Sequence, residues 1–235
     1  MALGITGLVA LAMNSRVLAA EPPQQIEGGL VRVDKAKLQH VYLLPGVSFA
    51  SYDRVRIDPV DVSFSPNWKP NASRRMPSQR LTAEDIEKIR SAVAEQFHKS
   101  FEDELGRGGY TVVNEDGPDV LRLTPRIVNL YITAPDKPSA SVTRTYTAST
   151  GHLTLDLTLR DSTTGQYLAR AVDTVQGRNG AGFQMQITNS ATNLGTARMA
   201  FSRWARALRE GLDDAKQASV TAESPAKFAG GATPR

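Results

Sequence analysis

A run of alternating leucines places the strongest constraint on the fold of this chain. Every second residue from position 153 to position 159 is a leucine, and the residues between them are polar: Leu153, Leu155, Leu157 and Leu159. Because successive side chains of a β-strand point to opposite faces, this pattern predicts a strand with one buried face. Residues 161–165 predict a turn, and residues 166–176 predict the partner strand of a hairpin. The chain therefore contains a sheet whose apolar face needs a cover.

Two amphipathic helices are predicted to supply that cover. The first begins at the N-cap residue Thr82, with Asp85 as a capping-box partner, and ends at Gly106. Its apolar positions recur at spacings of three and four residues: Ile86, Ile89, Val93, Phe97 and Phe101. The second runs from about residue 192 to residue 216, with the apolar positions Leu194, Ala197, Phe201, Trp204, Leu208, Leu212 and Ala215. The expected fold is α+β, a two-layer sandwich in which two amphipathic helices pack on one face of a mixed, mostly antiparallel β-sheet.

Four further extended segments are predicted upstream of the hairpin. Short runs lie at Val41–Leu44 and Tyr110–Val113, and longer strands are expected at Tyr52–Phe64 and Val120–Thr133. Within Tyr52–Phe64 the apolar residues change parity beside Pro59. Because proline has no N–H to donate, this change predicts a bulge or an edge position.

The N-terminus has the layout of a bacterial secretory signal peptide. The apolar run Ala2–Met13 precedes the cleavage-like tripeptide Val17-Leu18-Ala19. The run is short for a membrane span, and a retained anchor, a buried helix or a start site further upstream are the alternatives. The expected organisation is a signal peptide at 1–19, a flexible linker at 20–36, a single α+β domain at 37–217 and a disordered C-terminal tail at 218–235.

The charge and the cysteine count narrow the possible partners. The chain has 235 residues, a formal net charge of +4 and no cysteine. Without cysteine there is no disulfide framework, no thiol nucleophile and no residue for lipid attachment, which argues against a lipid anchor. The charge is small, and export would separate the protein from nucleic acid, so no nucleic-acid partner is expected. The expected location is the periplasm or the cell envelope.

Several short segments together resemble one bacterial family. They are Tyr52–Val60, Gly109–Val113, Gly117–Leu123, Arg160–Gly165 and Ala169–Asp173. In order and spacing they resemble the family known as domain of unknown function 3313, an uncharacterised family whose members are mostly described as lipoproteins. The similarity runs from about Leu30 to Ala215. The resemblance implies an envelope protein but assigns no functional residue, and this chain lacks the cysteine of the lipoprotein pattern.

One loop carries the best candidate contact surface. Residues 66–80 contain a tryptophan and four cationic side chains but no acidic residue. The candidate contact residues are Trp68, Lys69, Arg74 and Arg75, which would meet an envelope protein or an anionic envelope component. Peripheral association with the membrane is one form that such a contact can take. The alternative is that Trp68 folds back onto the domain.

Candidate metal and acid–base residues are sparse. His40, His98 and His152 are scattered, and none has further ligands at the spacing of a zinc site. Asp58 and Asp61 are three residues apart on an expected strand, so they point to opposite faces unless Pro59 introduces a bulge. No metal, cofactor or catalytic motif is therefore expected.

The function indicated is a non-enzymatic binding or accessory module of the cell envelope. Whether the protein has enzymatic activity stays open at this point. The alternative is an envelope hydrolase or carbohydrate-active enzyme whose site is formed from dispersed residues: Arg122, Arg126, Tyr131, Arg144 and Tyr146. A purely structural protein is a third interpretation.

Overall fold

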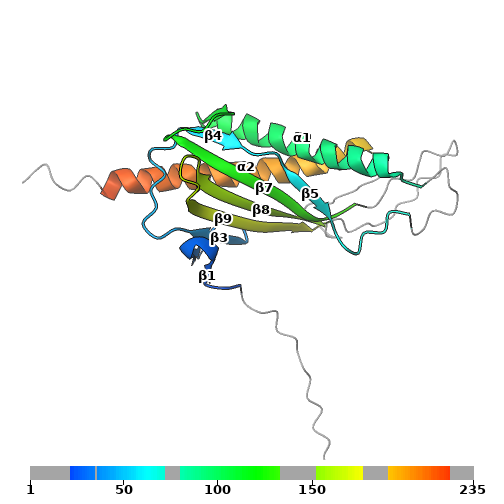
Figure 1. Ribbon diagram of the computed structural model, residues 1–235, viewed down its shortest axis with the longest axis horizontal. Helices are drawn as coiled ribbons and strands as arrows, with labels where there is room; N and C mark the ends of the chain where they lie inside the picture. Colours follow the sequence, from blue (N-terminus) through cyan, green and yellow to red (C-terminus); the bar gives the residue numbers. More distant parts are fainter. Residues whose placement is uncertain (1–21, 35, 72–79, 133–151, 177–189, 223–235) are drawn as a thin grey trace, which may run out of the picture.

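The structure, a computed structural model, describes residues 22–34, 36–71, 80–132, 152–176 and 190–222 (Figure 1). The elements in chain order are β1 (Gln25–Ile26), η1 (Glu27–Gly29), β2 (Leu30–Val33), β3 (His40–Leu43), β4 (Arg54–Ile57), β5 (Asp61–Phe64), α1 (Ala83–Arg107), β6 (Thr111–Val113), β7 (Val120–Tyr131), β8 (His152–Asp161), β9 (Tyr167–Gln176) and α2 (Ser190–Ala222).

The described strands form one mixed sheet. Their order is β1-β2-β3-β9-β8-β7-β4-β6, and β5 pairs with β7 next to the segment that β4 pairs with. The pairs that involve β4 or β5 are parallel, and the other pairs are antiparallel. The predicted α+β class, with a mixed and mostly antiparallel sheet and two helices on one face, is confirmed.

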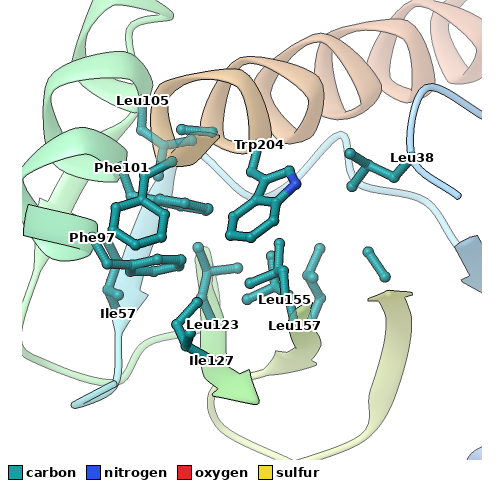
Figure 2. Packing of buried hydrophobic residues seen from close by; sticks show 14 of the residues in the cluster. Leu38, Ile57, Phe97, Phe101, Leu105, Leu123, Ile127, Leu155, Leu157 and Trp204 are labelled. Carbon is teal, nitrogen blue, oxygen red and sulfur yellow. The ribbon is translucent and has the colours of Figure 1, made fainter. Parts of the chain in front are cut away.

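The core lies between the two helices and the leucine face of the sheet. Figure 2 shows Phe97 and Phe101 of α1 and Trp204 of α2 directed at the side chains of β7 and β8. Strand register brings Leu123 beside Leu159, which places their side chains on the same face. These aromatic rings are fully buried, and burying a large apolar side chain stabilises a fold by roughly 1.5–3 kcal/mol.

The start of α1 follows from a local sequence signal. The side-chain oxygen of Thr82 accepts a hydrogen bond from the backbone N–H of Asp85, and the Asp85 carboxylate accepts one from the backbone N–H of Thr82. This capping box satisfies two backbone donors that a helix start leaves unpaired. The predicted start of the helix is confirmed. The helix ends at Arg107, where Gly108 is the C-cap.

The segment 52–64 forms two short strands, and the prediction of one long strand is wrong. Strands β4 and β5 pair with successive parts of β7, and residues 58–60 between them are not in a strand. After the end of β4, the backbone N–H of Asp58 still donates a hydrogen bond to the carbonyl of Leu123 on β7. Pro59 has no N–H to continue the ladder, so the strand breaks there.

The segment predicted as a flexible linker at 20–36 contains ordered structure. Strand β2 joins the sheet through β3, and Leu30 is buried with 1% of its surface exposed. The linker prediction rested on composition, but the four residues of β2 find a partner strand in β3. Helix α2 is also longer than predicted and continues to Ala222. The predicted signal peptide and most of the predicted tail lie outside the described residues.

Candidate functional site

Trp68, the predicted contact residue, packs against the end of the sheet. Its indole ring stacks on Phe64 with ring centroids 4.1 Å apart and an angle of 9° between the planes. Its Nε1–H donates a hydrogen bond of 2.6 Å to the backbone carbonyl of Ile132. The structure thus places Trp68 in the folded-back position, where it fixes the beginning of the loop.

Only some of the cationic residues of this loop lie among the residues that the structure describes. Lys69 follows the anchored tryptophan directly, and it is exposed. The backbone N–H of Trp68 donates to the carbonyl of Ser65, so a hydrogen-bonded turn joins β5 to the loop. Arg74 and Arg75 lie outside the described residues.

The three histidines lie on three different elements. His40 is on β3, and His98 is on α1 with its Nδ1 atom 3.9 Å from the Glu102 carboxylate. His152 begins β8, and its ring stacks on Tyr131 at 5.3 Å between centroids. Within the described residues, no group of three or more metal-ligating side chains lies together.

Asp58 and Asp61 differ in environment. Asp58 is buried and accepts hydrogen bonds from the Arg122 Nε at 2.8 Å and from the Thr124 hydroxyl at 2.8 Å. The Asp61 carboxylate is exposed and lies 3.5 Å from the Arg126 Nε. Asp58 thus holds the chain at the break between β4 and β5, and its hydrogen bonds are those of a structural carboxylate.

The face of the sheet that points away from the helices carries a layer of arginines. Arg122, for example, lies between two leucines whose side chains enter the core, so its own side chain points to the opposite face. We define the arginine face by Arg122, Arg126, Arg160 and Arg170 with Thr124, Thr158 and Asp156, which are contributed by β7, β8 and β9. In the sequence, the polar residues that alternate with the leucines of residues 153–159 indicate that such a face exists. Which residues lie next to one another on it depends on the register between the strands.

Asp156 is the main carboxylate of the arginine face. The Arg170 guanidinium donates two hydrogen bonds of 2.8 Å to its two oxygens. This hydrogen bonding raises the pKa of Arg170 above its ordinary value, against the lowering effect of burial. A planar guanidinium that meets a carboxylate at both oxygens is the strongest form of this contact and also fixes its geometry. The Arg126 Nη1 lies further away, 3.8 Å from the same carboxylate.

The structure brings together only some of the residues that were candidates for a dispersed enzyme site. Arg122 and Arg126 share the arginine face, and both lie close to carboxylates. Tyr131 ends β7 and stacks on His152. Arg144 and Tyr146 lie outside the described residues. Chemically, the described arginines are charge-assisted donors to carboxylate or phosphate oxygens.

A buried carboxylate joins α2 to the sheet on the helix side. Asp173 accepts hydrogen bonds from the Trp204 Nε1 at 2.7 Å, from the backbone N–H of Gln39 at 3.0 Å and from Arg203. These donors come from α2 and from the connection between β2 and β3. Asp173 therefore positions three segments of the fold. Neither α1 nor α2, in the parts that the structure describes, is long and apolar enough to cross a membrane.

Comparison with known proteins gives distant structural matches. A PelC dodecamer structure from Paraburkholderia phytofirmans is 12% identical, with 72% of this chain and 96% of that chain covered and a TM-score of 0.39. A minor lipoprotein from Acinetobacter baumannii is 11% identical, with 69% of this chain and 94% of that chain covered and a TM-score of 0.35. Similarities at this level transfer no function.

The family comparison is more decisive than the structural one. No curated protein matches the chain. The family model described as protein of unknown function (DUF3313) matches residues 28–208, which is more than half of the chain. This chain therefore belongs to the DUF3313 family.

Proposed function

We propose that this protein is exported to the bacterial cell envelope and acts there as a non-enzymatic binding or accessory module. The signal-like sequence of residues 1–19 supports export to the periplasm or the envelope surface. Membership of DUF3313 assigns no activity. The proposed partner is an anionic component of the envelope or a protein bound to it.

The observation that carries the proposal is the anchored start of the basic loop. Trp68 is held by stacking on Phe64 and by its hydrogen bond to Ile132. This anchor keeps the exposed Lys69 at the end of the sheet. The loop sequence continues with further cations and contains no carboxylate to neutralise them. Basic residues near an anionic membrane surface contribute about 1 kcal/mol each to binding.

Vesicle co-sedimentation tests the binding surface. The mature protein is expected to sediment with vesicles that contain phosphatidylglycerol and to remain in solution with phosphatidylcholine vesicles. The triple variant Lys69→Gln, Arg74→Gln and Arg75→Gln is expected to bind about a hundredfold more weakly, because it removes three cations from the loop.

A matched variant controls for the loss of net charge. Lys88→Gln, Lys99→Gln and Arg198→Gln together remove the same charge from exposed positions on the two helices. This control is expected to bind like the native protein. Equal weakening by both triple variants, or no vesicle binding by the native protein, would contradict the proposed surface.

Export is tested separately by periplasmic fractionation with N-terminal sequencing. The expected result is a periplasmic protein whose first residue is Ala20, after the predicted cleavage site. A cytoplasmic protein that retains Met1 would contradict export.

A further inference from the structure

The arginine face has an ordered arrangement across the three longest strands. Thr124 on β7 lies beside Thr158 on β8, which in turn lies beside Arg170 on β9. On one side of this row Arg122 lies beside Arg160, and on the other side Arg126 lies beside Asp156. The two threonines thus form the centre of the face, and arginines lie around them.

The cations over β7 and β8 are more exposed than the two buried carboxylates that they contact, and one exposed carboxylate, Asp61, lies beside Arg126 where β5 pairs with β7. The Arg126 side chain is 53% exposed, whereas the side chain of its partner Asp156 is 12% exposed. The Arg122 side chain is 36% exposed, whereas that of Asp58 is 9% exposed. A ligand that approaches over β7 and β8 therefore meets the guanidinium groups of Arg122 and Arg126 before it meets Asp58 or Asp156.

Part of the donor capacity of these arginines is unused. Arg122 donates only through Nε, so within the described part of the chain its two terminal amino groups have no hydrogen-bond partner. Arg126 reaches its two carboxylate neighbours only at 3.5 and 3.8 Å. A guanidinium has five N–H donors in a planar fork that matches a carboxylate.

From this arrangement we infer that the arginine face binds an extended acidic segment of a partner protein. Arg122 and Arg126 are four residues apart on one strand, which corresponds to about 13 Å. An extended peptide that runs along β7 repeats at the same spacing, so acidic side chains four residues apart would lie above these two arginines. The unused guanidinium donors of Arg122 and Arg126 are complementary to the carboxylates of such a segment.

The side chains around the face favour a peptide over a glycan or a membrane. Aromatic rings with a free face suit sugar rings, but the Tyr167 ring is covered by the Arg160 guanidinium at 4.2 Å, and Tyr42 is buried. Membrane insertion needs exposed apolar side chains. The large apolar residues that are exposed in the described part of the chain, Val31 and Met199, both lie off the arginine face.

The test uses fluorescence anisotropy with a labelled peptide in which Glu and Ser alternate over eight residues. The native chain is expected to bind it at low ionic strength, with affinity that falls as salt is added. Arg126→Gln is expected to weaken binding roughly five- to tenfold, because it removes the most exposed guanidinium of the face. Arg198→Gln, on the exposed side of α2, is expected to leave binding unchanged.

A second variant keeps the test independent of the ion pairs within the face. Thr158→Glu places a carboxylate at its centre and is expected to abolish peptide binding while the melting temperature stays close to that of the native protein. The inference is overturned if the native chain does not bind the peptide, if Arg198→Gln weakens binding as much as Arg126→Gln, or if polygalacturonate binds more tightly than the peptide. The basic loop at Trp68 is a different surface with a different probe, so either test can fail without the other.

Discussion

Replacement of Asp173 by asparagine tests whether this buried carboxylate holds α2 against the sheet. Asp173 is 7% exposed and accepts from Trp204, from Arg203 and from the backbone of Gln39. Asparagine has nearly the same shape but only one acceptor oxygen, and its NH₂ group must face one of these donors.

The expected cost follows from which donor loses its acceptor. The Trp204 N–H bonds one carboxylate oxygen and the Gln39 N–H bonds the other, so at least one of these two donors is left unsatisfied in the variant. An unsatisfied buried donor costs about 1–3 kcal/mol. The Arg203 side chain is 55% exposed, so water can hydrate its charge and its contribution is at most about 1 kcal/mol. The free energy of unfolding is therefore expected to fall by about 1–4 kcal/mol.

Urea denaturation followed by circular dichroism measures this change. With a slope of about 2 kcal/mol per molar urea, the midpoint is expected to move down by roughly 0.5–2 M. The control is Asp214→Asn, because the Asp214 side chain is 72% exposed and its carboxylate lies 3.6 Å from Lys37. Exposed ion pairs contribute little, so its midpoint is expected to stay unchanged. Equal midpoints for the two variants would refute the anchoring role of Asp173.

Three further predictions concern the core, the turns and the response to pH. Phe97→Ala empties a fully buried ring position, so urea denaturation is expected to show a loss of about 3–5 kcal/mol, and a loss below about 1 kcal/mol would contradict the packing described here. Gly28→Ala is expected to lower the melting temperature more than Gly165→Ala. Both glycines have positive φ, but of the two only Gly28 is placed so that an added Cβ would come within 2.9 Å of Tyr167. Equal shifts in melting temperature would argue against this contact. Burial and a hydrogen bond to the Asp161 carboxylate raise the pKa of Tyr52 from 10.0 to about 12. The unfolded chain therefore loses the Tyr52 proton at a lower pH than the folded chain does. The contribution of Tyr52 to the free energy of unfolding is full below pH 10 and is lost as the pH rises toward 12. Denaturation at a series of pH values should show a shallower alkaline decline for Tyr52→Phe, and parallel declines would count against the shift.

The elements that could be predicted from the sequence are those with a local cause. The capping box at Thr82 and Asp85 lies within one helical turn, and the leucine alternation that includes Leu157 is contained in one strand. Strand β2 was missed because it has only four residues, and its partner β3 pairs in turn with β9 near the other end of the chain. A short strand gains its stability from such non-local partners, and these are not visible in its own sequence.

The candidate surfaces were predictable to different degrees for the same reason. The composition of the basic loop singled out Trp68, but the stacking of its ring on Phe64 depends on how the loop turns after β5. The arginine face requires the register of three strands, which brings Arg126 beside Asp156. Alternation in the sequence gives the face on which a residue lies, whereas its neighbours on that face depend on tertiary pairing.

The order of the strands has a consequence for the kinetics of folding. Strand β3 near the beginning of the chain pairs with β9, more than a hundred residues later. Helix α2, which supplies Trp204 to the core, is the last element of the described residues. Chains dominated by such distant pairings fold slowly, because loop closure must precede the contacts that offset its entropy. A nascent chain that lacks α2 would leave the part of the leucine face that Trp204 covers exposed, so we expect the native core to close only after α2 has been synthesised.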